Sequence, residues 1–522
     1  MPAMASSSSQ TSVGGSDRSV RPAAVNEPRR SGDIPILICI AAATVLVHLL
    51  TGHQYGFQRD ELATLEDARH LAWGFVAYPP VTPFFGRLSL ILFGTSLAGF
   101  RFFAAVAQAV ALVFIGLMAR ELGGRRGAQL VATVAGVAFA LGAGALMQYV
   151  SFDYLCWVLV AYFVLRLLKS DDPRWWAAIG AGIGLGMESK YTMGFFVLAI
   201  VVAVVATPAR KYLASKWLWM GVGLSILVFL PNLIWQAQHH FVSLDFLKHI
   251  HTRDVGEGRA DDFLPGQLRL TLLATPLALA GLYFCLIAAA GRRFRMFGWM
   301  YVVTLVLFAI AKGRWYYMAG AYPMLFAAGA VWGEQWLSSL RHGWAWTVRG
   351  IAWVALACDA LLIAAIALPS APVNSPRWKF AAKNNGDLVE ELGWPELTAE
   401  VARIWESLPA AERAHSGILA ANYGEAGAIN LYGPALGLPR SLSGVNSWWA
   451  KGYGEHPPDT LIVVGYSQRF RDRNFSSCVL AGHTPNPYGI KNEETGDHPD
   501  IFVCRGMKQS WPEFWSDFQY YG

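Results

Sequence analysis

The hydrophobic positions of this chain are gathered into long runs, separated by short loops that are either basic or rich in aromatic residues. A helix that crosses a membrane needs about 20 apolar residues, or about 17 where the bilayer is thin. By that measure the pattern predicts about eleven transmembrane helices, and residues 83–94 form a shorter apolar segment that could be partly embedded. The predicted spans cover residues 34–52, 98–119, 127–147, 150–168, 175–189, 192–208, 216–234, 267–290, 297–311, 316–338 and 347–368.

Every second loop between these runs is basic, which predicts the orientation of the chain. Loops that stay in the cytoplasm carry an excess of lysine and arginine. The alternation places the N-terminus in the cytoplasm, and an odd number of spans then puts the C-terminal part on the extracytoplasmic side. The basic groups are Arg120, Arg125 and Arg126; Arg166, Lys169 and Arg174; Arg210, Lys211 and Lys216; Arg292, Arg293 and Arg295; and Arg341 with Arg349.

The composition supports a membrane protein and argues against nucleic acid as a partner. Of 522 residues, 54% are hydrophobic and only 15% are charged, and the mean hydropathy is +0.34. The net charge of +6 is spread over short clusters, as in cytoplasmic loops. Residues 1–32, rich in serine and arginine, are predicted to be a disordered cytoplasmic tail. The run that begins at Ile34 has span length and no small-residue cleavage site, so we expect it to remain as the first helix.

From residue 369 onward the chain becomes polar and rich in turn residues. Short β-like runs at Thr460–Gly465 and Ile501–Cys504 predict a small soluble α/β domain. Within it, Cys478 and Cys504 could form a disulfide in an oxidising compartment, and two unpaired thiols are the alternative. The predicted organisation is a tail over residues 1–32, a mainly α-helical polytopic membrane bundle over residues 33–368 and an extracytoplasmic α/β domain over residues 369–522.

The ionisable residues that stand out fall on the predicted extracytoplasmic side, at the ends of apolar runs. Ionisable groups near a bilayer are costly and mark candidate functional sites. Cations on the side that is normally poor in them need an anion, and a lipid phosphate is the natural one. The alternatives are lysines that extend to lipid headgroups, an aspartate that caps a helix at residue 153, and a solvated acidic pair. The residues concerned are Arg59, Asp60, Glu61, Asp153, Lys190, Lys312, Arg314, Tyr316 and Tyr317.

Carboxylates that face a cation-lined phosphate pocket suggest transfer of a sugar from a polyprenyl-phosphate carrier. Lysine and arginine stabilise the charge that develops on the phosphate leaving group. A carboxylate takes the proton of an acceptor hydroxyl as this hydroxyl attacks the anomeric carbon. Two other classes stay open. One is a transporter or flippase of polyprenyl-linked glycans, for which inverted repeats and charged residues at the middle of the bilayer are expected. The other is a membrane-anchored binding protein.

The order of the polar motifs resembles that of a known enzyme family. In chain order the motifs are Arg59-Asp60-Glu61, Pro79-Pro80, Asp153, Ser189-Lys190-Tyr191, Tyr316-Tyr317 and Tyr322-Pro323. Over roughly residues 34–335, this order resembles bacterial polytopic membrane glycosyltransferases of the protein-O-mannosyltransferase and aminoarabinose-transferase type, which have the GT-C fold and are similar to glycosyltransferase family 39. Residues 422–428 also resemble a segment common in the C-terminal domain of one bacterial branch.

The resemblance implies a mannose-like or pentose sugar on a polyprenyl phosphate and an acceptor hydroxyl on a lipid, glycan or protein. It also implies catalysis at the extracytoplasmic face of the bacterial inner membrane, with membrane lipids as the surroundings. Asp60 becomes the expected general base, with Glu61 and Asp153 as further acidic site residues. Roles in binding the donor phosphate are expected for Lys190, Arg59, Lys312, Arg314, Tyr316 and Tyr317.

Two further positions and one alternative complete the predicted site. Tyr78 stands where the family usually has a histidine before two prolines, and Tyr191 follows Lys190 directly. His249 lies four residues after Asp245, a spacing that would allow a divalent metal site on a helix. We favour an amphipathic segment at the membrane surface for this loop.

Overall fold

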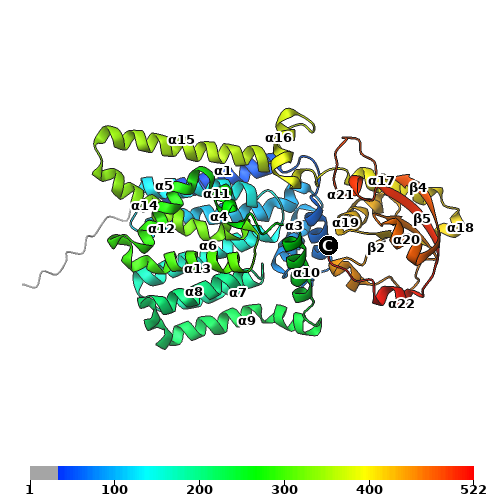
Figure 1. The fold of residues 1–522 in the computed structure, drawn as a ribbon, viewed down its shortest axis with the longest axis horizontal. Helices are drawn as coiled ribbons and strands as arrows, with labels where there is room; N and C mark the ends of the chain where they lie inside the picture. Colours follow the sequence, from blue (N-terminus) through cyan, green and yellow to red (C-terminus); the bar gives the residue numbers. More distant parts are fainter. Residues whose placement is uncertain (1–32) are drawn as a thin grey trace, which may run out of the picture.

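The computed structural model describes residues 33–522, which form a helical bundle and a smaller α/β domain placed end to end (Figure 1). The predicted disordered tail, residues 1–32, lies outside the described residues. We call the end of the bundle that contacts the C-terminal domain the domain end, and the opposite end the far end. The order of elements confirms the predicted class, a mainly α-helical bundle followed by a small α/β domain.

The apolar runs become helices because a helix satisfies its own backbone hydrogen bonds, which lipid cannot do. Among the described residues, eight helices are long and apolar enough to cross a membrane, or nine if the bent pair at residues 193–214 is one span. The number of eleven spans therefore stays a prediction. The bundle helices are α1 (Ile34–Thr51), α4 (Leu97–Glu121), α5 (Arg126–Ala143), α6 (Tyr149–Ser170), α7 (Trp175–Met187), α8 (Met193–Ala206), α9 (Lys216–Gln238), α11 (Phe263–Thr271), α12 (Thr275–Leu286), α13 (Arg295–Ile310), α14 (Tyr322–Ser339) and α15 (His342–Ala367).

Helices at the centre and at the edge of the bundle differ in what their apolar side chains face. In α4 and α6, 61% and 67% of the apolar stretch is buried inside the protein, whereas in α9 and α15 the share is 17% and 11%. Apolar residues on these outer helices, such as Leu227 and Leu361, are exposed. Such a surface is unfavourable in water and suits contact with lipid tails. The chain is an integral membrane protein.

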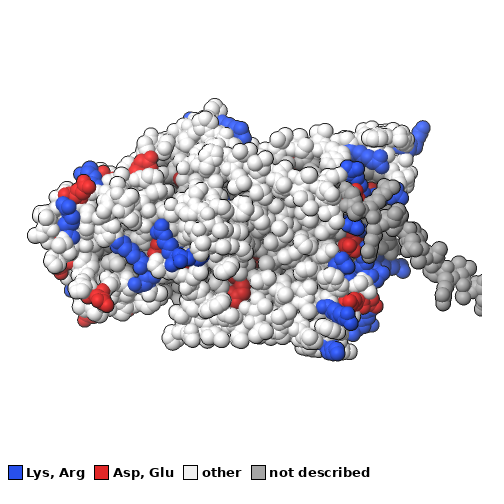
Figure 2. All heavy atoms as spheres, turned by 180° about the vertical axis from the view of Figure 1, so that it is seen from behind, with Lys and Arg blue, Asp and Glu red and all other residues white. Residues whose placement is uncertain are grey.

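The charged residues are concentrated at the two ends of the molecule. Figure 2 shows a broad band of surface nearly free of charge between them. The basic loops predicted to share one side do meet at the far end. Arg166 pairs with Glu121 at 3.7 Å, and Arg293 donates to the backbone carbonyls of Leu168 and Lys169. This distribution is the one that a bilayer around the apolar band requires.

Short elements at the domain end fill the space between the bundle and the C-terminal domain. α2 (Arg59–Arg69) and α3 (Val81–Phe93) come from the first loop, α10 (Val242–Gly256) follows α9, and the 3-10 helix η5 (Trp315–Ala321) precedes α14. The helix α2 is polar, and its first residues are stabilised by a capping box. Gln58 accepts a hydrogen bond from the Asp60 amide while Glu61 accepts one from the Gln58 amide. This reciprocal cap sets the direction in which the side chains of α2 point.

The C-terminal domain is built on a five-stranded mixed sheet in the order β2-β1-β3-β5-β4. β1 (Ser416–Ala420) runs parallel to β2 (Ser441–Leu442) and β3 (Thr460–Val464), whereas β5 (Asp500–Met507) is antiparallel to β3 and to β4 (Phe475–His483). The two runs predicted as strands correspond to β3 and β5. The helices of the domain are α16 (Pro376–Asn384), α17 (Trp394–Ser407), α18 (Ala410–Arg413), α19 (Tyr423–Tyr432), α20 (Gln468–Asn474), α21 (Glu493–Gly496) and α22 (Trp511–Ser516).

A disulfide links two strands within this domain, and a shared apolar core joins the domain to the bundle. Cys478 and Cys504 face each other in register on β4 and β5 and form a disulfide, the first of the two predicted alternatives. The first loop of the bundle also shares a core with the domain, because Leu62 and Leu65 of α2 belong to one buried apolar cluster with Trp394 and Ile429. Burial of that cluster fixes α2 between the bundle and the domain.

Candidate functional site

A cavity of about 1140 Å³ lies between the domain end of the bundle and the C-terminal domain. Small-molecule sites usually measure roughly 300–1,000 Å³, so this space is at the large end of that range. Its walls come from α2, the turn before α8, α10, the segment before η5 and the C-terminal domain. The charged residues that line it are Arg59, Asp60, Asp67, Lys190, Arg253, Asp254, Arg259, Lys312, Arg314, Asp387 and Glu390.

Asp60 lies in the first turn of α2 and faces this cavity. Tyr423 of the C-terminal domain donates a hydrogen bond to its Oδ1 atom at 2.9 Å. Gln148 donates from Nε2 to the Oδ2 atom at 3.3 Å. A carboxylate offers about four lone-pair sites, so acceptor capacity is left on each oxygen. Asp60 is thus held in place and can still accept a proton from a group in the cavity.

Glu61 is the next residue, yet it points into the protein and away from the cavity. It is fully buried, and the guanidinium group of Arg101 donates to it, with the shortest contact at 2.6 Å. The Met147 amide donates to it at 2.8 Å, and Arg101 also contacts Glu391 at 3.2 Å. The structure therefore places Glu61 in a buried ion pair outside the cavity, where the sequence predicted a catalytic carboxylate.

Lys190 lies in the turn after α7, and its ammonium group is enclosed by aromatic rings. The Nζ atom lies 4.0 Å from the ring centre of Tyr317, 4.7 Å from that of Tyr149 and 5.7 Å from that of Tyr316. Burial lowers the pKa of Lys190 to about 8, because a poorly hydrated site disfavours the ammonium form. Ring faces attract a cation but do not neutralise it. An anion bound beside Lys190 would gain strongly from this arrangement.

Two further predicted cations, Lys312 and Arg314, line the cavity from the segment between α13 and η5. Arg314 contacts both carboxylate oxygens of Asp254 on α10, at 2.6 and 2.9 Å, and donates to the Tyr316 hydroxyl at 3.0 Å. A two-bonded contact of this kind fixes the plane of the guanidinium group. Arg253, which the sequence analysis did not single out, adds another positive charge to this wall.

Residues 148 and 149 connect the acidic and the basic parts of the cavity. Gln148 donates to Asp60, and the ring of the adjacent Tyr149 lies 4.7 Å from the Lys190 ammonium. Asp60 and Lys190 are far apart in the sequence, but both line this cavity, and the adjacent residues Gln148 and Tyr149 lie between them. A ligand with an anionic group at one end can contact both.

Three further residues of the predicted site, Arg59, Tyr78 and Tyr191, also line the cavity. Arg59 forms an ion pair with Glu390 at 3.0 Å, and Tyr78 donates to Asp67 at 2.9 Å.

Asp153 lies outside the lining. It accepts hydrogen bonds from Trp157 at 2.9 Å and from Thr192 at 3.3 Å. Because Thr192 stands two residues after Lys190, Asp153 supports the turn that carries the lysine.

The predicted alternative of a metal site at His249 and Asp245 falls on α10. The ring of His249 packs against that of Tyr521, with their centres 5.8 Å apart. Within residues 33–522, no group of three His, Cys, Asp or Glu side chains is placed to hold a metal ion.

The sequence analysis missed the contribution of the C-terminal domain to the site. Asp387 and Glu390 close the acidic side of the cavity, and burial raises the pKa of Glu390 to about 7. Tyr423 contacts Asp60 although 363 positions separate them. The available signal was local: Asn422 and Glu425 form a capping box that places Tyr423 at the first position of α19. Such a signal predicts a helix start and does not indicate which distant residue it meets.

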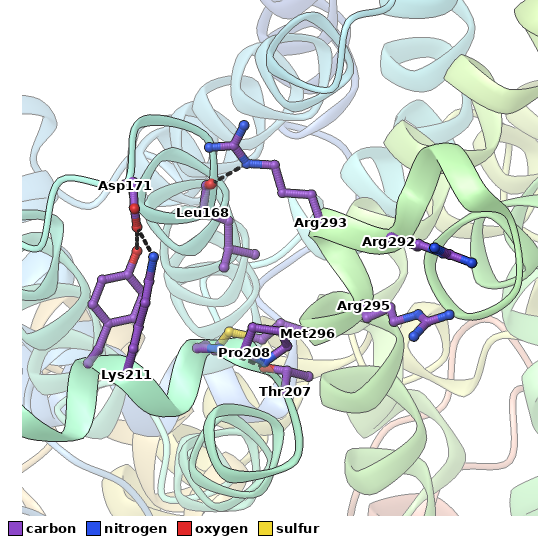
Figure 3. A pocket seen from close by; sticks show the side chains of 11 residues that line it. Leu168, Asp171, Thr207, Pro208, Lys211, Arg292, Arg293, Arg295 and Met296 are labelled. Atoms are coloured by element: carbon purple, nitrogen blue, oxygen red, sulfur yellow. Dashed lines mark hydrogen bonds and ion pairs between the residues drawn. The ribbon is translucent and has the colours of Figure 1, made fainter.

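The far end contains a second, smaller cavity of about 160 Å³, lined by basic residues (Figure 3). Its charges are already engaged or turned away. Lys211 pairs with Asp171 at 2.5 Å, and Arg293 donates to two backbone carbonyls at 2.6 and 2.7 Å. Figure 3 shows the side chains of Arg292 and Arg295 directed away from the cavity. The larger cavity, where a carboxylate and cations share one space, is the candidate functional site.

Comparisons with known proteins bear on this site. Residues 77–235 match a family model described as dolichyl-phosphate-mannose-protein mannosyltransferase. The match covers less than half of the chain and includes Tyr78, Gln148, Asp153 and Lys190. A comparison with curated protein sequences gives no match.

Among solved structures, the chain is similar to ArnT from Cupriavidus metallidurans bound to undecaprenyl phosphate, with 14% identity and a TM-score of 0.57. This alignment covers 91% of the chain and 98% of ArnT. The apo form of ArnT gives 15% identity, a TM-score of 0.56 and coverage of 90% and 97%. The archaeal oligosaccharyltransferase AglB from Archaeoglobus fulgidus aligns over 83% of this chain and 69% of its own, with 11% identity and a TM-score of 0.45.

The likeness to ArnT shows the fold, which is that of the GT-C membrane glycosyltransferases. Together with the partial family match, it confirms the resemblance predicted from the order of the polar motifs.

Proposed function

We propose that this protein is a membrane glycosyltransferase that moves a sugar from a polyprenyl-phosphate carrier to an acceptor hydroxyl. The observation that carries the proposal is the shared cavity, which is lined by the carboxylate of Asp60 and by the cations Lys190, Lys312 and Arg314. The matched mannosyltransferase model and the complex of ArnT with undecaprenyl phosphate support this class of donor.

The donor phosphate binds among the cations. Lys190 supplies an ammonium group that is enclosed by tyrosine rings, and Arg314 supplies a guanidinium group whose plane Asp254 fixes. Charge-assisted hydrogen bonds to phosphate are roughly twice as strong as neutral ones. The apolar part of the carrier lies along side chains that line the same cavity, namely Phe195, Phe246, Leu247, Ile250 and Phe308.

Transfer then takes place between Asp60 and the cations. The acceptor oxygen forms a bond to the anomeric carbon while its proton passes to the Asp60 carboxylate. The bond from that carbon to the phosphate oxygen breaks, and the electron pair leaves with the carrier phosphate, whose growing charge the cations stabilise. Attack from the face opposite the phosphate inverts the anomeric centre.

The location follows from the charge distribution. The basic loops at the far end support a cytoplasmic location for that end, with the site on the extracytoplasmic side of the bacterial inner membrane. The disulfide between β4 and β5 supports an oxidising compartment around the C-terminal domain. The acceptor is a lipid, a glycan or a protein that reaches the site from that side.

The test uses the full chain in proteoliposomes with undecaprenyl phosphate that carries a tritiated hexose or pentose. Extracts of envelope lipids and proteins serve as acceptors. We expect tritium to move to an acceptor and free undecaprenyl phosphate to appear in equal amount. If tritium crosses the bilayer while still bound to the carrier, the protein is a flippase and the proposal is wrong.

A further inference from the structure

One residue of the C-terminal domain reaches into the catalytic half of the cavity. Tyr423, the first residue of α19, donates a hydrogen bond from its hydroxyl to Asp60 Oδ1 at 2.9 Å. Its ring also lies beneath the guanidinium group of Arg59, 5.3 Å from ring centre to Cζ. The hydroxyl and the ring thus contact two adjacent residues at the start of α2.

The close approach of α19 to α2 depends on two glycines. A Cβ atom at Gly424 would lie 2.6 Å from the Cγ of Arg59, and one at Gly427 would lie 2.8 Å from the Leu62 side chain and 3.0 Å from its carbonyl oxygen. Any larger residue at position 427 would have to push the backbone of α2 away. The helices are therefore packed backbone to backbone, which brings the Tyr423 hydroxyl within reach of Asp60.

The start of α19 is itself fixed. The Asn422 side chain accepts a hydrogen bond from the Glu425 amide at 2.8 Å, and Glu425 accepts bonds from the amides of Asn422 and Ala421 at 3.1 and 3.0 Å. A capping box of this kind leaves little freedom to the residue next to the cap. Tyr423 is held on a rigid element, as a positioning group requires.

We propose that Tyr423 is a positioning residue for Asp60, so that the C-terminal domain completes the catalytic site. The inference rests on the proposed function, in which Asp60 is the base. The Tyr423 hydroxyl holds one oxygen of the carboxylate while Gln148 holds the other, which directs the remaining lone pairs into the cavity.

Tyr423 stays a donor over the whole working range of pH. Burial raises the pKa of its phenol well above the usual range, and the charge of Asp60 raises it further. The other charged or titratable groups near Asp60 are Arg59 on its own helix, Tyr78, Tyr149 and Tyr316 of the bundle, and Asp387 and Glu390 of the C-terminal part. None of these is in hydrogen-bond contact with the Asp60 carboxylate among the described residues.

The first test compares Tyr423→Phe with Tyr453→Phe, a control whose ring stacks on Trp511 in the same domain. Loss of a hydrogen bond to a charged group corresponds to about a 10- to 100-fold fall in kcat. Because Tyr423 does not contact the phosphate, KM for the donor should change less than twofold. A fall in kcat without a matching rise in KM distinguishes a positioning role from a general loss of structure. The control should match the wild type.

A second readout needs no activity. Carbodiimides modify accessible carboxyl groups, and peptide mass spectrometry gives the rate at which Asp60 is modified at one fixed pH. We expect this rate to rise in Tyr423→Phe, because one carboxylate oxygen loses its partner, and to stay the same in Tyr453→Phe. If kcat and the modification rate are both unchanged, the positioning role is wrong. If the wild type transfers no sugar, the proposed function fails, while the modification rate still decides whether Tyr423 holds Asp60.

A third variant acts through the helix contact and leaves the tyrosine in place. Gly427→Ala should separate α19 from α2 and lengthen the hydrogen bond, with a fall in kcat and a faster modification of Asp60, as in Tyr423→Phe. Gly496→Ala is the matched control, because a Cβ at Gly496 meets no other atom within 4 Å. A Gly427→Ala protein that is folded and has the wild-type kcat and modification rate would overturn the proposal.

Discussion

The two ends of the bundle both carry several cations, yet they use them in different ways. At the far end, Lys211 pairs with Asp171 and Lys169 pairs with Glu121, at 2.5 and 3.0 Å. At the domain end, Lys190 is surrounded by tyrosine rings and faces a large cavity that also contains Asp60. Cations alone therefore do not distinguish a functional site from a membrane boundary. The distinction is whether the cations face a large cavity together with a carboxylate, as Lys190 does with Asp60, because Arg314 at the domain end is paired too.

The largest expected effect separates the carboxylates of the two ends. Asp60→Asn keeps the side-chain shape but removes the proton acceptor, so kcat should fall by about 10²–10⁴-fold. Asp171→Asn at the far end, which loses only a surface pair with Lys211, should retain wild-type kcat. Release of tritiated sugar from the carrier measures both. Full activity of Asp60→Asn would show that Asp60 is not the base and that the carboxylates of the two ends do not differ in function.

Adjacent residues show how far the sequence could predict the site. The alternating basic loops predicted the side on which Asp60 and Glu61 lie, and the resemblance of the polar motifs assigned both residues to the site. Neighbouring residues on a helix differ by about 100° in direction. Once α2 forms, Asp60 therefore faces the cavity and Glu61 faces Arg101. The separation of the two roles depends on a helix whose start is determined by its caps.

The contacts made by the C-terminal domain could not be predicted for a different reason. Its strands β3 and β5 were visible as local apolar runs, and the apolar spans were visible as long ones. The approach of Tyr423 to Asp60 depends on two glycines of α19 that meet the surface of α2. This contact joins distant parts of the chain, and no local pattern in a single sequence encodes it.

The second expected effect concerns stability and compares a buried ion pair with an ion pair at the surface. Glu61→Ala leaves the buried Arg101 with only Glu391 as an acidic partner, which should lower the free energy of unfolding by about 3–5 kcal/mol. Glu121→Ala at the far end removes a partly exposed partner of Lys169 and should cost less than about 1 kcal/mol. Denaturant unfolding in detergent, followed by tryptophan fluorescence, measures both. Equal losses of unfolding free energy in the two variants would show that the buried ion pair of Glu61 contributes no more to stability than a surface pair.

The third effect separates the lysines of the two ends. Lys190→Ala removes a charge-assisted contact to the donor phosphate, so KM for the polyprenyl-phosphate sugar should rise about 10- to 100-fold. Lys211→Ala, which breaks the pair with Asp171, should leave KM unchanged. Initial rates over a range of donor concentrations provide the comparison. An unchanged KM in Lys190→Ala would exclude a contact between this lysine and the phosphate.

The smallest expected effect is the pH dependence of donor binding, which follows from the environment of Lys190. Burial lowers the pKa of this lysine to about 8, and in the proposed function the phosphate binds its ammonium form. As the pH rises through 8 the ammonium form is lost, so KM for the donor should rise by about a factor of two at pH 8 and up to about tenfold at pH 9. Below pH 7 the ammonium form is complete and KM should be flat. Lys190→Arg provides the control, because a guanidinium group keeps its charge above pH 12 and should remove the rise. If KM still rises with pH in Lys190→Arg, another group is titrating, and the burial of Lys190 does not control the pH dependence of donor binding.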